Sequence, residues 1–262
     1  MSDRRPLISG NWKMNHDHIE ALHMVRDLGL RLKADDVANL DISVHPPFTD
    51  LRTVQTLVEK ESIPLSLGAQ HCSDAEAGAR TGEVSAQMLA RLSTSYVLVG
   101  HSERRQLFGM TDETVAATLL AVLRQGMTPI LCVGETEEHR VRSQTESTLE
   151  RQMLTAIEPL SAEQVAGMVV AYEPIWAIGT GQAATAVDAE DACVFLRAMV
   201  AKSAGEEAAE TVRIQYGGSV QEDNCANLVS EPDVDGLLIG GASLQAASFL
   251  DIIRACGACY RS

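Results

Sequence analysis

Long hydrophobic runs are missing from this chain of 262 residues. No stretch approaches the ~18 consecutive apolar residues that a membrane-spanning helix needs. The chain begins Met-Ser-Asp-Arg-Arg-Pro and shows no apolar leader. No low-complexity linker or block of like charge divides it. We therefore expect one globular domain over residues 1–262, located in the cytoplasm and without membrane contact.

Positive charge is also scarce. The chain holds 21 Lys and Arg against 36 Asp and Glu, which gives a formal net charge of −15. A surface this acidic repels phosphate backbones, so nucleic acid is not an expected partner. An anionic substrate would need a local positive site inside this negative field.

Several motifs that carry cofactor or metal chemistry are absent. The sequence has no Gly-Lys-Ser/Thr phosphate loop, no HExxH, no paired CxxC and no calcium-binding loop. The six cysteines are spread along the chain, which is typical of free thiols in a reducing compartment. Cys256 and Cys259 have CxxC spacing without a second pair, and we interpret them as thiols at a helix end. We expect no metal and no cofactor.

What the sequence does contain is an alternation of short β-rich apolar runs with longer helical patterns. The runs predict strands that begin near eight positions: Leu7, Asp41, Leu65, Tyr96, Thr128, Met168, Val212 and Gly236. Eight β-then-α units in one domain favour an α/β fold, a closed (β/α)8 TIM barrel. The alternative is a doubly wound open sheet, but the first turn, residues 10–15, lacks the glycine fingerprint of that fold.

Polar residues follow the predicted strands at the end where barrels carry their active sites. Asn11 and Lys13 follow the first strand, His101 the fourth and Glu173 the sixth. Glycine-rich turns follow the last two strands, at Gly217-Gly218-Ser219 and Gly240-Gly241. Such turns let backbone amides approach a phosphate, and Lys13 would add the positive charge.

These parts suit one kind of chemistry. An apolar run from Pro174 to Gly181 follows Glu173 and ends in glycines, so we expect a mobile lid. A carboxylate beneath such a lid loses water and becomes a stronger base, able to remove a proton next to a carbonyl. His101, Lys13 and Asn11 offer the donors that a developing enediolate needs.

Six motifs in this order resemble the triosephosphate isomerase family, from about residue 7 to about residue 250. They are Gly10-Asn11-Trp12-Lys13, Gly100-His101-Ser102-Glu103, Cys132-Val133-Gly134-Glu135, Tyr172-Glu173-Pro174-Ile175-Trp176, Tyr216-Gly217-Gly218-Ser219 and Gly240-Gly241-Ala242-Ser243. The resemblance implies interconversion of dihydroxyacetone phosphate and D-glyceraldehyde 3-phosphate through an enediolate, a step of glycolysis and gluconeogenesis.

The resemblance also implies roles for individual residues. Glu173 is the proton-transferring base, a neutral His101 polarises the carbonyl, and Lys13 and Asn11 bind substrate. Amides at Gly179, Ser219, Gly240 and Gly241 hold the phosphate. A surrounding set supports them: Ser102 holds Glu173, Glu103 orients Lys13, Glu135 meets the Trp176 indole, and Cys132 and Tyr216 lie nearby.

Members of the family are homodimers, and the resemblance places the contact in the loop from Gln70 to Glu83. Three positions depart from the family pattern: His71 replaces an Asn, Arg80 replaces a Phe, and Gln182 replaces a Lys at the end of the lid. Two alternatives stay open at this point. One is a barrel isomerase for a longer phosphosugar, and the other is a non-catalytic barrel that serves as a scaffold.

Overall fold

The computed structural model describes residues 4–178 and 184–260, and its strands form a closed parallel barrel in the order β1 to β8. The strands are β1 (Leu7–Asn11), β2 (Asp41–His45), β3 (Ser66–Ala69), β4 (Tyr96–Val99), β5 (Thr128–Val133), β6 (Val169–Tyr172), β7 (Arg213–Tyr216) and β8 (Gly236–Ile239). The predicted TIM barrel is confirmed. Five of the expected strand starts match, and the other three lie one residue earlier than the observed starts.

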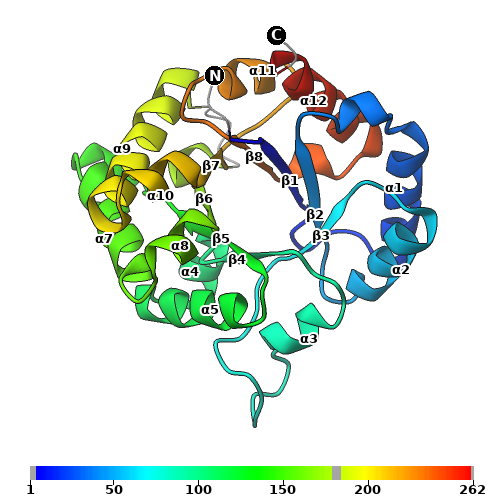
Figure 1. The fold of residues 1–262 in the computed structure, drawn as a ribbon, viewed down its shortest axis with the longest axis horizontal. Coiled ribbons are helices and arrows are strands. Elements are labelled where there is room, and N and C mark those ends of the chain that lie inside the picture. The colour runs from blue at the N-terminus through cyan, green and yellow to red at the C-terminus, as the bar shows by residue number, and fades with distance from the viewer. Residues whose placement is uncertain (1–3, 179–183, 261–262) are drawn as a thin grey trace.

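Helices surround the barrel and cover its outer face (Figure 1). They are α1 (His18–Arg31), α2 (Leu51–Glu61), α3 (Ala86–Ala90), α4 (Ser102–Phe108), α5 (Asp112–Arg124), α6 (Glu137–Val141), α7 (Thr145–Ile157), α8 (Ala162–Ala166), α9 (Ala186–Ala204), α10 (Glu206–Thr211), α11 (Cys225–Val229) and α12 (Ala246–Cys259), with 3-10 turns η1 (Ala34–Asp36), η2 (Ile175–Ala177) and η3 (Gly241–Ser243). Their starts follow local chemistry. Thr111, for example, caps α5 by accepting from the Thr114 amide.

The inside of the barrel combines an apolar layer with a polar one. Leu7, Leu98, Ile130 and Val169 belong to a buried apolar cluster. Gln215 Nε2 donates to the Leu7 carbonyl at 2.8 Å and to Ser9 Oγ at 2.9 Å, so it links β7 to β1. Buried polar groups of this kind are stable because they are hydrogen-bonded to one another and to backbone.

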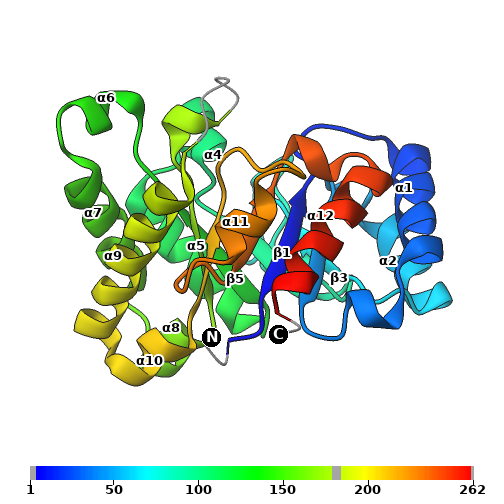
Figure 2. The same cartoon turned by 90° about the horizontal axis from the view of Figure 1, so that it is seen from above.

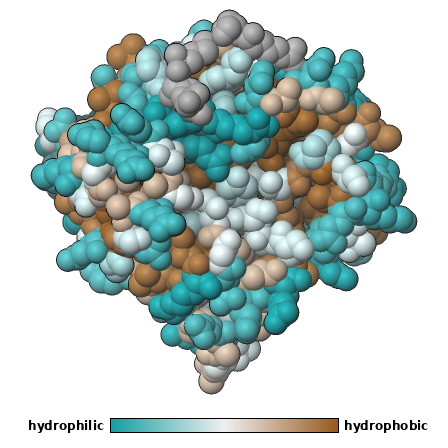
Figure 3. Space-filling model, in the orientation of Figure 1, coloured by the Kyte–Doolittle hydropathy of each residue, from teal (hydrophilic) through white to brown (hydrophobic). Residues whose placement is uncertain are grey.

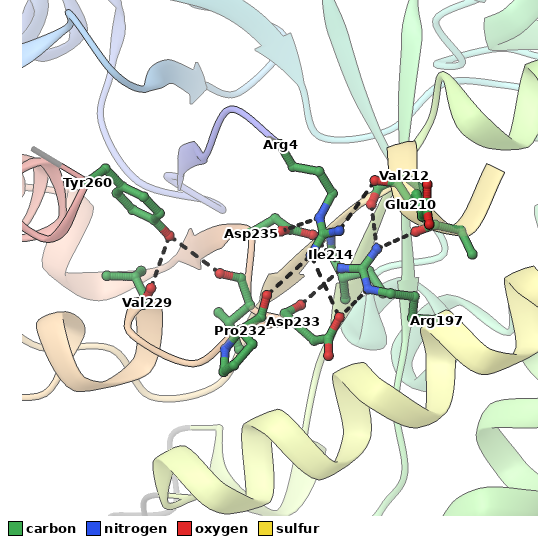
Figure 4. Close-up of polar contacts among 12 residues, drawn as sticks. Arg4, Arg197, Glu210, Val212, Ile214, Val229, Pro232, Asp233, Asp235 and Tyr260 are labelled. Atoms are coloured by element: carbon green, nitrogen blue, oxygen red, sulfur yellow. Dashed lines mark hydrogen bonds and ion pairs between the residues drawn. The ribbon is translucent and has the colours of Figure 1, made fainter. Parts of the chain in front are cut away.

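The two termini lie at the end of the barrel from which β1 starts (Figure 2). Ion pairs there join the segments just before β1 and β8 to α9 (Figure 4). The buried carboxylate of Asp235 accepts hydrogen bonds from Arg4 Nε at 2.6 Å, from Arg197 Nη2 at 2.6 Å and from the Ile214 amide at 2.9 Å. Arg197 also pairs with Asp233. Because these charges sit opposite the strand ends that carry polar residues, their role is structural.

Asp235→Ala therefore tests how this end of the barrel is closed. The substitution leaves Arg197, whose side chain is 13% exposed, without its buried partner. We expect a loss of up to about 3 kcal/mol in the free energy of unfolding, because Arg4 and Arg197 then keep only the less buried Asp233 as an acidic partner. Urea unfolding measures it. Asp251→Ala on the exposed face of α12 is the control, and a loss no larger than in that control would contradict the assignment.

Candidate active site

A cavity of about 300 Å³ opens at the carboxyl ends of the strands. Its walls come from segments that follow strands far apart in sequence. The lining residues include Asn11, Trp12, Lys13, Asn15, His101, Glu173, Ile178, Gly217, Gly218, Ser219, Val220, Gln221, Leu238, Gly240, Gly241, Ala242 and Leu244. The structure thus brings together the predicted catalytic and phosphate-end residues that it describes. Gly179 and Gln182 lie outside the described residues.

Glu173 is held at this cavity almost without solvent exposure. It follows β6, and its amide donates to the Val133 carbonyl at 2.8 Å. The Ser102 amide donates to Glu173 Oε2 at 2.8 Å, while Oε1 lies 2.9 Å from His101 Nε2. Gly134 packs under this backbone so closely that a Cβ there would lie 1.8 Å from the Glu173 carbonyl oxygen. The carboxylate is therefore held in place by contacts to the Glu173 backbone and by contacts to both carboxylate oxygens.

His101 is the N-cap of α4, and its position fixes the proton on its ring. The Glu103 amide donates to Nδ1 at 3.3 Å, so Nδ1 is an acceptor. The ring proton then sits on Nε2, which faces Glu173. Burial disfavours the charged imidazolium, but the Glu173 carboxylate outweighs burial and raises the pKa of His101 above its ordinary value. That influence depends on the carboxylate remaining where it is.

The pKa of Glu173 moves in the opposite direction. Burial by itself would raise it, but the neighbouring His101, the Ser102 amide and the Lys13 charge together hold the pKa of Glu173 below its ordinary value. In the ligand-free arrangement the carboxylate therefore favours the protonated imidazole, and the imidazole favours the ionised carboxylate. A ligand that separates them removes this mutual stabilisation.

Lys13 supplies the cationic side chain of the cavity. Its backbone has φ +53°, in the left-handed region that residues with a side chain rarely adopt. Asn11 Oδ1 accepts from the Lys13 amide at 3.0 Å, and Gln70 Nε2 donates to the Lys13 carbonyl at 2.8 Å. Lys13 Nζ lies 2.7 Å from Glu103 Oε1. Strain of this kind persists only where neighbouring contacts hold the backbone, as Asn11 and Gln70 do here.

The other end of the cavity consists of backbone turns. Gly217, Gly218 and Ser219 follow β7, and Asn224 Nδ2 donates to the Ser219 carbonyl at 3.1 Å. Gly240 precedes the turn η3, whose first residue is Gly241. Tyr216 supports these turns from below, because a Cβ at Gly218 would lie 2.1 Å from the Tyr216 hydroxyl. Amides and one lysine suit an anionic group such as a phosphate.

A buried carboxylate, Glu135, lies behind Glu173. Tyr172 Oη donates to Glu135 Oε1 at 3.1 Å, and Trp176 Nε1 donates to the same oxygen at 2.8 Å. Burial raises the pKa of Glu135, and burial followed by the Glu173 charge raises the pKa of Cys132 well above its ordinary value. Cys132 is therefore a buried neutral thiol rather than a nucleophile.

Three residues that the sequence did not single out in these roles shape the site. Gln70 was expected in a contact between subunits, yet within this chain it bonds to the carbonyls of Lys13 and His45. Arg105 donates to the Gly100 carbonyl at 2.7 Å and fixes the turn before α4. Arg140 stacks on Trp176. The contacts of Gln70 and Arg140 have no local signal, because they join segments that only the fold brings together; Arg105 likewise reaches the Cys132 carbonyl at 3.2 Å.

Residues 4–178 and 184–260 lack two features that would point to other functions. No three His, Cys, Asp or Glu side chains in these ranges are grouped so that they could hold a metal ion. No helix in the same ranges has the length and hydropathy to cross a membrane.

The fold and site define a class: a (β/α)8 barrel whose cavity at the carboxyl ends of the strands is lined by a buried carboxylate, an imidazole, a lysine and glycine turns. Residues 6–256 match the family model described as triosephosphate isomerase. The chain is 51% identical to the triosephosphate isomerase of Corynebacterium efficiens over 246 residues, 94% of each chain. It is 47% identical to that of Streptomyces coelicolor over 255 residues, 97% of this chain and 98% of the other. The chain belongs to the triosephosphate isomerase family.

The pairing of Glu173 with His101 predicts a dependence of stability on pH, because each group shifts the pKa of the other. Because the pKa of Glu173 is lowered in the folded protein, its ionised carboxylate stabilises the fold at pH values above the ordinary pKa of 4.5. This contribution is lost as the pH falls through the pKa of Glu173 in the folded protein. Because the pKa of His101 is raised in the folded protein, its protonation stabilises the fold fully at pH values below the ordinary pKa of 6.5. This contribution is lost as the pH rises through the pKa of His101 in the folded protein. Both contributions are present together between these values.

His101→Asn keeps an acceptor for the Glu103 amide but does not titrate. We expect the wild type to exceed this variant in free energy of unfolding by more at about pH 5.5 than at about pH 9. Urea unfolding at the two pH values measures the difference, with His23→Asn on the exposed face of α1 as the control. A difference equal at both pH values would mean that the pairing with Glu173 does not raise the pKa of His101.

Proposed function

We propose that this chain interconverts dihydroxyacetone phosphate and D-glyceraldehyde 3-phosphate, as a step of glycolysis and gluconeogenesis in the cytoplasm. The observation that carries the proposal is the pairing of a buried base, Glu173, with an imidazole 2.9 Å away at the mouth of a cavity that contains one lysine. Proton removal next to a carbonyl requires such a base, and a small phosphorylated substrate requires such a cavity.

Glu173 removes a proton from the hydroxymethyl carbon of dihydroxyacetone phosphate. The electron pair of that C–H bond forms a carbon–carbon double bond, and the carbonyl electrons move to oxygen to give an enediolate. His101 donates a proton to that oxygen and takes one from the hydroxyl of the first carbon, Glu173 delivers its proton to the neighbouring carbon, and the aldehyde forms at the first carbon. No electrons are gained or lost overall, so the step itself calls for no redox cofactor.

His101, Lys13 and Asn11 stabilise the enediolate. When substrate draws Glu173 towards its carbon, His101 loses the carboxylate that raises its pKa. The remaining influences, burial and the Glu103 amide on Nδ1, favour a neutral ring with its proton on Nε2. That proton can be donated to the carbonyl oxygen, and the Lys13 ammonium balances the developing charge.

The phosphate occupies the far end of the cavity, at Ser219, Gly240 and Gly241. Gly179 completes this set in the family pattern. The supporting residues act through the catalytic ones: the Ser102 amide holds Glu173, and Glu103 orients the Lys13 ammonium. Glu135 anchors Trp176, while Cys132 and Tyr216 pack beneath the base and the glycine turn.

A coupled assay of glyceraldehyde 3-phosphate formation tests the proposal, and Glu173→Asp makes it specific to this residue. The shorter side chain withdraws the carboxylate by about an ångström, and misplacement on that scale costs roughly a hundredfold in rate. We expect kcat to fall by about that factor. KM should change little, because the phosphate contacts lie elsewhere.

Glu138→Asp on α6, whose side chain is exposed, is the matched control and should retain full activity. Two results would overturn the assignment: no turnover of triose phosphates by the wild type, or an unchanged kcat in Glu173→Asp.

We further propose a homodimer that forms through the loop Gln70–Glu83. This loop projects from the barrel at the lower edge of Figure 1, and the space-filling view shows the same projection (Figure 3). A Cβ at Gly78 or Gly82 would meet nothing within 4 Å, so the loop tip packs against little in its own chain. Exposed apolar side chains follow the adjacent strands, among them Met14 and Phe48. A second copy of the chain would cover both features.

His71 and Arg80 fit inside this loop without disturbing the site. Burial lowers the pKa of His71 to about 4, with the charge of Arg104 a smaller cause, so His71 is neutral at pH 7. Arg80 pairs with Asp74 within the loop. These two departures therefore change the surface of the proposed contact and leave the catalytic residues untouched.

Met14→Glu tests the dimer. Met14 is 95% exposed in the single chain, and a charge there would be buried without a partner in the proposed interface. We expect the dissociation constant to rise at least tenfold, about 1.4 kcal/mol, as measured by sedimentation equilibrium. Leu30→Glu changes an apolar residue that is 78% exposed on α1 and should not alter association. Equal association of both variants would place the interface elsewhere.

A further inference from the structure

Arg140 on α6 contacts three groups from three different parts of the site. Its guanidinium carbon lies 4.1 Å from the centre of the Trp176 ring. Its Nη2 lies 2.8 Å from Asp188 Oδ1, and its Nη1 lies 4.0 Å from Glu135 Oε1. An arginine suits this position because its planar cation can stack on an indole and pair with carboxylates at the same time.

The positive charge of Arg140 compensates the buried carboxylate of Glu135. The Glu135 side chain is fully buried, and Tyr172, Trp176 and Arg140 all approach its Oε1, while Oε2 has no hydrogen-bond partner among the described residues. Tyr216 on β7 also lies within electrostatic range. Of these groups only Arg140 carries a positive charge, so it is the one that compensates the buried carboxylate.

The second carboxylate connects Arg140 to the start of α9. Asp188 completes the capping box of that helix, since the Thr185 amide and hydroxyl both donate to its Oδ2. Arg140 therefore joins the first turn of α9 to the 3-10 turn η2, which holds Trp176. The chain segment directly after Glu173, Pro174–Ala177, is tied in this way to α6 and to α9.

We propose that Arg140 is a positioning residue for the isomerase reaction: it holds Trp176 against Glu135 and so fixes the backbone that places Glu173. This inference rests on the proposed function for its kinetic consequence. Its structural half, the restraint of Trp176, can be measured without substrate. Trp176 is three residues from the base, so movement of η2 displaces the Glu173 backbone directly.

The first test uses tryptophan fluorescence in the ligand-free protein. The chain has two tryptophans, and Trp176→Phe isolates the signal of the fully buried Trp12. Trp176 emission is followed against pH in the wild type, Arg140→Met, Arg140→Lys and Arg142→Met. Glu135→Gln identifies the transition that belongs to Glu135, because that variant loses it. Arg142 is the matched control, an exposed arginine two residues away that pairs with Glu138.

Removing the Arg140 charge should make Glu135 protonate at higher pH. We expect the midpoint of the Trp176 transition to rise in Arg140→Met, because the Arg140 charge is one of the groups that lower the pKa of Glu135 against the effect of burial. Arg140→Lys should restore most of the shift, and Arg142→Met should leave the midpoint at the wild-type value. A residue that serves only for packing would not move this midpoint.

The second test is kinetic. A displacement of less than an ångström at Glu173 should lower kcat about tenfold in Arg140→Met, with KM changed by less than about threefold. If Arg140 acts through Trp176, the double variant Arg140→Met/Trp176→Phe should be no slower than Trp176→Phe alone. Asp188→Asn removes the other anchor of Arg140 and should lower kcat in the same direction.

Two results would overturn the proposal. One is an Arg140→Met variant with the fluorescence midpoint and kcat of Arg142→Met. The other is independence of the two sites, with the double variant slowed by the product of the single effects. A wild type without isomerase activity would overturn the proposed function instead, while the fluorescence arm would still decide whether Arg140 restrains Trp176.

Discussion

The burial of the Glu173 carboxylate is the constraint on which the rest of the site depends. A charge with 1% exposure is costly unless it is compensated, and the compensation comes from elements far apart in the chain. The Ser102 amide comes from the start of α4 and the imidazole from His101. Under the proposed function, the contacts that stabilise the resting carboxylate are the ones that a substrate would replace, which would link stability and reactivity at this one residue.

The two ends of the barrel differ in how their charged side chains are paired. At the end where the termini lie, Arg4, Arg197 and Asp235 pair with one another, so the charges there are satisfied within the chain (Figure 4). At the other end, Lys13 is held in a strained conformation and its ammonium faces a cavity. In a chain with a net charge of −15, this cation just after β1 is a local positive charge at the cavity.

Much of the barrel could be predicted because its signals are local. Apolar runs of strand length predicted the starts of the strands to within one residue, and the Thr111 cap of α5 is likewise a contact between near neighbours in sequence. The glycine pairs after the last two strands marked the backbone turns that line the cavity. What could not be predicted were contacts without a local pattern. Gln70 reaches the Lys13 carbonyl across 57 positions, and Arg140 reaches Asp188 across 48. Nothing near either residue in sequence indicates its partner.

The sequence by itself determined the fold class, the order of the motifs and the identities of Lys13, His101 and Glu173, because strand periodicity and residue chemistry are properties of short segments. Only the tertiary structure decided how these residues act on each other. The tautomer of His101 follows from an amide at the start of α4, and its pKa follows from the carboxylate of Glu173, which comes two strands later in the chain. A distance of 2.9 Å between groups so far apart in sequence exists only once the barrel has closed, because closure is what places the ends of β4 and β6 at the same mouth.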